Sequence, residues 1–299
     1  MVEAVATAEP VAAPWRHLYP FASHFLDVGG HRLHYVDEGP RGATPLLLVH
    51  GNPTWSFFWR SLIERFAPER RVVAPDHLGC GLSDKPQRWP YRLRDHIDNL
   101  ERLVLSLDLR DLTLGVHDWG GAIGFGFAAR HPERVARLVV LNSAAFRSSA
   151  IPFRIAVCRL PWLGALAVRG LNGFALAAAR MTTVRPLPAE VRAGYLAPYG
   201  SWRERVAVLR FVQDIPLAPG HPSYDTLVAV EEALPRFRDR PALVLWGERD
   251  WCFTTAFCDA WQRRLPGASV HRLPGAAHYV VEDAPEEVAG RVADFLARE

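Results

Sequence analysis

The sequence has few cysteines and no segment that carries charge of one sign. Its 299 residues contain no C-x-x-C pair, and no histidine stands at metal-ligand spacing from a cysteine. These absences argue against a disulfide framework and a structural zinc site, so we predict no metal and no cofactor. The formal net charge is only +3, which argues against nucleic acid as a partner. The four cysteines are Cys80, Cys158, Cys252 and Cys258.

The sequence also lacks a convincing signal peptide or membrane-spanning segment. Residues 1–20 include acidic residues and have no basic start, so we interpret them as a loose leader. The most apolar segment, residues 155–181, is interrupted by Arg159, Pro161 and Arg169 well short of the roughly 20 residues that a membrane span needs. We expect buried or amphipathic helices there and a cytoplasmic protein.

Apolar runs alternate with helical patterns over most of the chain. Residues 23–28 and 31–38 predict an antiparallel hairpin around Gly29 and Gly30. The later runs are continuous, as expected for strands buried on both faces of a parallel sheet. These runs are 45–49, 71–75, 137–142, 242–246, 269–273 and the one that begins at Leu112, and the helices expected among them include 55–66, 91–109, 255–264 and 285–297.

Residues 144–240 interrupt this alternation. They contain helical segments with many prolines and glycines, and no convincing buried strand. We therefore predict a helical cap inserted at 144–240 into a core formed by residues 21–143 and 241–299. The predicted fold class is α/β, with a mostly parallel eight-stranded sheet and flanking helices.

The segment around Asp118 carries the first chemical prediction. The run from Leu112 leads into His-Asp-Trp-Gly-Gly and then a helix of small residues, an arrangement that holds a nucleophile on a sharp strand-to-helix turn. A carboxylate at this position needs no base to activate it and suits attack on a saturated carbon. The alternative is that Asp118 only caps the helix.

Two further residues follow the last predicted strands. Asp250 stands just after the run 242–246, and His278 stands just after the run 269–273. The chain order of nucleophile, acid and histidine suits a triad, because loops after parallel strands converge on one crevice. His278 would be the base and Asp250 would orient it. Most of the 12 histidines must be surface or structural residues, and the rivals of Asp250 are Glu248, Glu282 and Asp283.

Asn52 and Trp119 form a second predicted group. Trp119 follows Asp118 directly, and Asn52 lies in the loop after the run 45–49. Each brings a backbone N–H and a side-chain N–H donor, which together suit a departing anion such as a halide or a carboxylate. The alternative is that Trp119 belongs to the core and that Asn52 is a turn residue before Pro53.

From about residue 21 onward the chain resembles the haloalkane dehalogenases and epoxide hydrolases of the α/β-hydrolase superfamily. The resemblance rests on HGNPTWSFFWR, APDHLGCGLSDKP and HDWGGAIGFGFAARHPER. It implies an α/β-hydrolase fold in which Asp118 is the nucleophile, His278 the base, Asp250 the supporting acid, and Asn52 with Trp119 the anion-binding pair.

The position in the chain of the acidic residue that supports the histidine refines this resemblance. Many dehalogenases carry it as a glutamate after the strand before the cap, where this chain has Asn142 and Ser143. The chain therefore resembles the third dehalogenase subfamily. Within it, GYLAPYGSW, FVQDIPL and HPSYDTL are most similar to the β-lactone decarboxylases of bacterial long-chain olefin biosynthesis.

The latter resemblance implies a long-chain hydrophobic substrate and partner enzymes that make it. Asp118 would open a 3,4-dialkyl β-lactone to an ester, and loss of carbon dioxide would leave a cis-alkene. Apolar cap residues can bury alkyl chains at roughly 0.8 kcal/mol per methylene. The alternative is that these residues only form the core of the cap itself.

Three other functions use the same sequence features. A haloalkane dehalogenase would displace halide with Asp118 and activate water with His278. An epoxide hydrolase would need acidic donors from the cap, for which Tyr195, Tyr199 and Tyr224 are available. A hydrolase fold without catalysis could serve as a binding subunit, because fold does not imply function.

Overall fold

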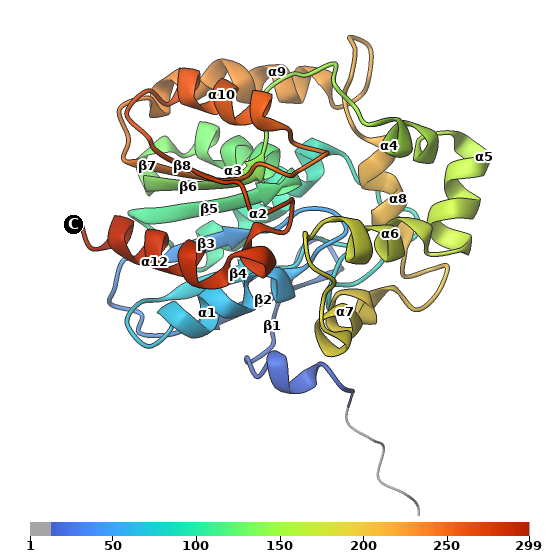
Figure 1. Ribbon diagram of the computed structural model, residues 1–299, viewed down its shortest axis with the longest axis horizontal. Coiled ribbons are helices and arrows are strands. Elements are labelled where there is room, and N and C mark those ends of the chain that lie inside the picture. The colour runs from blue at the N-terminus through green and yellow to red at the C-terminus, as the bar shows by residue number, and fades with distance from the viewer. Residues whose placement is uncertain (1–12, 299) are drawn as a thin grey trace, which may run out of the picture.

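The computed structural model describes residues 13–298 and has an eight-stranded sheet at its centre (Figure 1). The strand order is β1-β2-β4-β3-β5-β6-β7-β8, with β1 and β2 antiparallel to their neighbours and the other pairs parallel. The predicted α/β class and mostly parallel eight-stranded sheet are confirmed. The strands are β1 (His24–Asp27), β2 (Arg32–Glu38), β3 (Leu46–Val49), β4 (Val72–Pro75), β5 (Leu112–Asp118), β6 (Val135–Ser143), β7 (Ala242–Gly247) and β8 (Ser269–Leu273).

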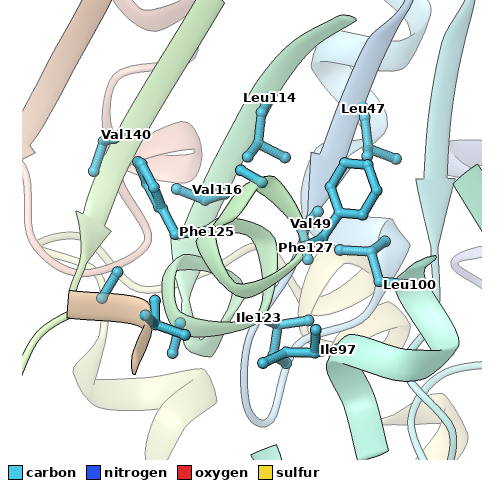
Figure 2. Packing of buried hydrophobic residues seen from close by; sticks show 14 of the residues in the cluster. Leu47, Val49, Ile97, Leu100, Leu114, Val116, Ile123, Phe125, Phe127 and Val140 are labelled. Carbon is cyan, nitrogen blue, oxygen red and sulfur yellow. The ribbon is translucent and has the colours of Figure 1, made fainter. Parts of the chain in front are cut away.

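Helices cover both faces of the sheet because alternate strand residues point to opposite sides. Leu47 and Val49 of β3 pack on the side of α2 and α3, whereas Leu46 and Leu48 pack on the side of α1 and α12. Figure 2 shows the first of these layers, with Ile97 of α2 beside α3 and the strands behind it. The core helices are α1 (Arg60–Phe66), α2 (Leu93–Ser106), α3 (Trp119–Arg130), α10 (Thr255–Arg264), α11 (Val280–Asp283) and α12 (Pro285–Leu296), with short 3-10 helices η2 (Ser56–Trp59), η3 (Pro132–Arg134) and η6 (Leu234–Phe237).

The segment 144–240 is helical and contains no strand among its residues, all of which are described. Most of its helices gather at one end of the sheet, whereas α9 packs against α2 and α3 of the core (Figure 1). Tyr199, Val168 and Val208 form a small apolar cluster inside this region. Besides η6, which packs on the core, its elements are α4 (Phe153–Cys158), α5 (Pro161–Gly164), the π-helix η4 (Ala165–Gly170), α6 (Gly173–Met181), α7 (Ala189–Leu196), η5 (Ala197–Tyr199), α8 (Val206–Gln213) and α9 (Tyr224–Ala233).

In the part of the chain that the structure describes, no single helix is both long and apolar enough to cross a membrane. By length and composition the pair Pro161–Gly170 and Gly173–Met181 passes together, but the two pieces are bent by 67° relative to each other. Of the predicted leader, residues 1–12 lie outside the described residues. Beyond them, η1 (Arg16–Leu18) leads to Tyr19, which is buried against Trp55.

Candidate active site

Asp118 lies at the sharp turn between β5 and α3. Its backbone has a φ of 52° and a ψ of −125°, a region that residues other than glycine rarely adopt. Glycines make the turn possible: a Cβ atom on Gly120 would meet the backbone of Val49, and one on Gly51 would meet the Asp118 side chain. The Asp118 side chain makes no capping hydrogen bond to α3. The strongest contact of its carboxylate is instead with the backbone of Asn52.

The two carboxylate oxygens of Asp118 have different surroundings. Oδ1 accepts a hydrogen bond of 2.6 Å from the backbone N–H of Asn52, and Oδ2 lies 3.7 Å from Nε2 of His278. Burial raises the pKa of Asp118, although the charge of His278 and the N–H groups of Asn52 and Trp119 act against this shift. One oxygen is thus fixed by the backbone, and the other is left beside the imidazole. That arrangement suits a carboxylate nucleophile.

His278 connects Asp118 to Asp250. Its Nδ1 lies 2.7 Å from Oδ2 of Asp250, and the ring of Phe253 stacks on the imidazole with centroids 5.7 Å apart. Burial lowers the pKa of His278, but the charge and hydrogen bond of Asp250 and the charge of Asp118 outweigh burial, so the pKa is raised overall. The two carboxylates therefore favour the protonated form of His278 more than solvent does.

The three rivals of Asp250 have their contacts elsewhere. Glu282 forms a two-bond ion pair with Arg60 and accepts a hydrogen bond from Tyr195. Asp283 accepts hydrogen bonds from the backbone of Val184 and Ala277, and Glu248 lies beside Arg272. Only Asp250 among these four acids is bonded to His278 in the described structure.

Sequence reasoning missed several residues that position this group. Asn142, at the end of β6, donates hydrogen bonds from Nδ2 to Oδ2 of Asp250 at 2.9 Å and to the carbonyl of Gly247 at 3.1 Å. His117 bonds through Nε2 to the carbonyl of His278 at 2.9 Å, and Ser143 donates to the carbonyl of Asp118 at 2.5 Å. The available signal was polar residues at the ends of two otherwise apolar strands.

Replacing Asn142 by aspartate is expected to destabilise the fold. The change puts a second carboxylate where an amide now donates to Asp250, so the unfolding free energy at neutral pH should fall by at least about 2 kcal/mol. The repulsion raises the pKa of the carboxylate pair, so the loss should shrink as the pH is lowered. Urea unfolding at several pH values measures it.

Asn172→Asp is a matched control for this substitution. Asn172 also has a positive φ, and its Nδ2 donates to the carbonyl of Tyr199 rather than to a carboxylate. We expect the control to lose less unfolding free energy. Because it creates no pair of carboxylates, its loss should not shrink as the pH is lowered. Equal losses at every pH would contradict the position assigned to Asn142.

The predicted anion-binding pair lies beside Asp118. The Asn52 side chain donates from Nδ2 to the carbonyl of Val208 on α8 at 3.2 Å, so one of its two amide hydrogens is committed to the cap. Its Oδ1 is buried, with no hydrogen-bond partner among residues 13–298. The half-buried ring of Trp119 lies 5.3 Å from that of Phe211. The structure thus brings Asn52 and Trp119 together, with the Asn52 backbone N–H bound to Asp118.

An apolar cavity of about 420 Å³ lies next to these groups. Asn52, Asp118, Trp119 and His278 line it together, and a cavity of this size suits a small organic ligand. No tyrosine lines it, and no cluster of three or more His, Cys, Asp or Glu within residues 13–298 is placed to hold a metal ion. The apolar walls come from both core and cap and include Phe146, Ile155, Phe174, Val212, Leu227 and Phe253.

Comparison with known proteins gives a consistent family. Residues 44–285 match the family model of the alpha/beta hydrolase fold. A cis-3-alkyl-4-alkyloxetan-2-one decarboxylase from Shewanella oneidensis is 43% identical over 93% of this chain and 89% of its own length. A haloalkane dehalogenase from Mycobacterium marinum is 36% identical over 92% of this chain and 93% of its own length.

A solved structure leads to the same family. The haloalkane dehalogenase DbeA from Bradyrhizobium elkani is 29% identical and superposes with a TM-score of 0.84 over 93% of this chain and 100% of that one. The expected resemblance to dehalogenases and β-lactone decarboxylases is therefore confirmed. The chain belongs to the α/β-hydrolase family, within the group that contains haloalkane dehalogenases and oxetan-2-one decarboxylases.

Proposed function

We propose that this enzyme is a β-lactone decarboxylase that converts long-chain cis-3,4-dialkyl β-lactones into cis-alkenes and carbon dioxide. Identity is higher to the oxetan-2-one decarboxylase than to the dehalogenase, and an oxetan-2-one is a β-lactone. The observation that carries the chemistry is the position of Asp118 at an apolar cavity, with Oδ1 held by the backbone of Asn52 and Oδ2 3.7 Å from Nε2 of His278. A carboxylate held in this way can attack a saturated ring carbon.

The proposed reaction has two steps. Oδ2 of Asp118 attacks the saturated ring carbon that bears the ring oxygen. The bond between this carbon and the ring oxygen breaks with inversion, and the lactone becomes an alkyl ester of Asp118 with a free carboxylate. The bond from the neighbouring carbon to this carboxylate then breaks and releases carbon dioxide. The electron pair of this broken C–C bond forms the double bond. At the same time the ester C–O bond breaks, and its electron pair returns to the Asp118 carboxylate. Inversion followed by anti elimination gives the cis-alkene from the cis-lactone, without water or a net proton transfer.

The surroundings of Asp118 suit the second step. Negative charge moves from the substrate carboxylate to the Asp118 carboxylate as carbon dioxide leaves. The Asn52 N–H and the His278 imidazolium lie where this returning charge develops, so they stabilise the transition state more than the ester. Asp250 orients the His278 ring and raises the pKa of His278, which favours its charged form. We propose that the side chains of Asn52 and Trp119 hold the substrate carboxylate before it breaks down.

The cavity walls suit alkyl chains. Each methylene that moves from water into such surroundings contributes roughly 0.8 kcal/mol, so two long chains supply most of the binding free energy. The buried members of the small apolar cluster around Tyr199 do not line the cavity, whereas Ile155 and Val212 line it without belonging to that cluster, and Phe174 contacts both. The cap therefore has apolar side chains for its own core and others for a ligand.

Haloalkane dehalogenation is the second candidate. It is favoured by the 36% identical dehalogenase and by the close superposition with DbeA, and it uses Asp118 and His278 in the same places. Epoxide hydrolysis has less support, because the cap tyrosines do not line the cavity. Tyr195 donates to Glu282 and Tyr199 to the carbonyl of Thr54.

The proposed reaction also implies neighbours in metabolism. An insoluble, strained lactone must be supplied by enzymes that make it, so we propose that the chain works beside such enzymes and forms a complex with them. We propose a cytoplasmic location for this assembly, in keeping with the resemblance to the bacterial olefin pathway.

The products distinguish the two candidates. We expect purified protein to release alkene and carbon dioxide from a cis-dialkyl β-lactone and to release little halide from a 1-haloalkane of similar length. Gas chromatography measures the alkene, and a reaction in 18O-labelled water should leave no label in the organic product. Rapid halide release together with an unchanged lactone would replace this proposal with the dehalogenase.

A further inference from the structure

The cap exposes an unusual number of large apolar side chains. Eight of the eleven exposed large apolar residues of the described chain fall within residues 153–184. Trp162 is 90% exposed and Phe153 is 81% exposed. Isolated exposed apolar residues are ordinary, but a concentration of this kind marks an interaction site. We define the apolar cap surface as Phe153, Leu160, Trp162, Leu163, Leu166 and Leu171.

The same region carries charge of one sign. Residues 144–189 contain six arginines and no lysine, aspartate or glutamate, so this segment carries +6. Because the whole chain carries +3, the remainder carries −3. Arg147 is ion-paired with Glu231, which lies outside this segment. Arg154, Arg180 and Arg185 are exposed, and no ion pair of the described structure joins them to a carboxylate. The charge of this face is therefore available to an anionic partner.

The bend between the helices determines how they can meet a membrane. The two pieces Pro161–Gly170 and Gly173–Met181 meet at 67°, and their inner side chains Val168 and Ala175 pack against Tyr199 of the cap. Inserting the pair across a bilayer would expose this cluster and bury Arg169 and Arg180 in hydrocarbon. Lying in the interface leaves the cluster intact, with apolar side chains in the acyl layer and arginines at the headgroups.

The elements that carry the apolar cap surface also line the cavity. Ile155 and Cys158 of α4, Ala167 of η4, and Phe174 and Ala177 of α6 all line it. The exposed side chains Phe153, Leu166 and Leu171 lie on or directly beside these same elements. A surface that covers this part of the cap is therefore formed by the same helices that wall the cavity.

We propose that the apolar cap surface docks on a bilayer that contains anionic phospholipid, so that alkyl substrates enter the cavity from the hydrocarbon without crossing water. Tryptophan, leucine and phenylalanine suit the acyl boundary, and exposed arginines such as Arg154 and Arg180, which form no ion pair in the described structure, suit a negative headgroup layer. The docking rests on the surface alone, whereas the identity of the entering substrate rests on the proposed function.

Vesicle binding tests the docking. The full chain is mixed with vesicles of phosphatidylcholine alone or of equal parts phosphatidylcholine and phosphatidylglycerol, and the bound fraction is measured by sedimentation. We expect stronger binding to the anionic vesicles, weakened by salt. Trp162→Ser with Leu163→Ser should lower the vesicle partition coefficient at least about tenfold, and Arg180→Glu should lower the preference for anionic vesicles.

The control is Leu105→Ser, the same kind of change at an exposed leucine on α2 of the core. It should bind vesicles as the unchanged chain does, and circular dichroism should give the same melting temperature for all variants. Binding that is equal with and without phosphatidylglycerol, or that survives the double change at 162 and 163, overturns the proposal. Binding to a lactone-forming enzyme through this surface, with none to vesicles, overturns it in favour of a protein partner.

Turnover separates this inference from the proposed function. With a short, water-soluble β-lactone the double variant should be as active as the unchanged chain, because neither Trp162 nor Leu163 lines the cavity. With a long-chain lactone held in anionic vesicles its turnover should fall with its binding. No turnover of either lactone by any form refutes the decarboxylase, while the vesicle-binding result still decides the docking.

Discussion

Asp118→Asn is expected to abolish alkene formation while leaving the fold at least as stable as before. The amide has no anionic oxygen to attack the ring carbon, so turnover should fall by about 10⁴-fold or more, as for other removed nucleophiles. Its Oδ1 can still accept the hydrogen bond that Asn52 donates to Asp118. Turnover is followed by gas chromatography and stability by urea unfolding.

The expected stability follows from the direction of the pKa shift. Burial raises the pKa of Asp118 in the folded chain above its ordinary value of 3.8. The folded state therefore binds the proton more tightly than the unfolded state, and the fold is most favoured when Asp118 is neutral. This advantage is complete below the unfolded pKa and is lost as the pH rises through the folded pKa. Asparagine stays neutral at all pH values and avoids the loss.

Asp37→Asn is the matched control. Asp37 is also a buried carboxylate, but it lies on β2 and forms a two-bond ion pair with Arg71, away from the cavity. Its loss should leave turnover unchanged and lower the unfolding free energy by about 3 kcal/mol, because Arg71 is left without its partner. A variant at 118 that still makes alkene, or that loses as much stability as the variant at 37, contradicts the role given to Asp118.

The sequence predicts the sheet well because its strands are recognised locally. Continuous apolar runs mark β3, β4 and β7 within a residue of their observed ends, and Ser269–Leu273 is found as expected. The approach of Asp250 and His278 also follows from local information, since both come directly after strands of one parallel sheet. The prediction of residues 55–66 as one helix is less accurate, because the chain forms η2 before α1 begins at Arg60.

Contacts between distant segments lie beyond such patterns. The Asn52 side chain donates to Val208, which is 156 residues away and becomes its neighbour only once the cap is in place. The bond between Asn142 and Asp250 likewise joins two strand ends through side chains whose directions no periodicity encodes. In the cap, the sequence does not distinguish leucines that pack inward from leucines that face solvent. Only the packing separates Leu209, which is buried, from Leu171, which is exposed.

His278→Gln is expected to have different consequences for the two candidate substrates. Hydrolysis of a haloalkane-derived ester needs a base for water, so this variant should keep an alkyl group on Asp118 after a single turnover. A lactone-derived ester breaks down by losing carbon dioxide and needs no base. The variant should therefore still make alkene, but about 10²-fold to 10⁴-fold more slowly, because the imidazolium beside Oδ2 is gone.

The pH dependence of lactone turnover gives an independent readout of His278. The pKa of this histidine is raised above its ordinary value of 6.5, so the imidazolium persists above the usual range and is lost only as the pH rises through the folded pKa. Turnover by the unchanged chain should fall as the pH rises through the folded pKa, and the glutamine variant should show no such fall.

Intact-protein mass spectrometry measures the ester on Asp118 of the glutamine variant. If the variant accumulates a lactone-derived adduct and makes no alkene, His278 acts instead as a base for water, as in a hydrolase.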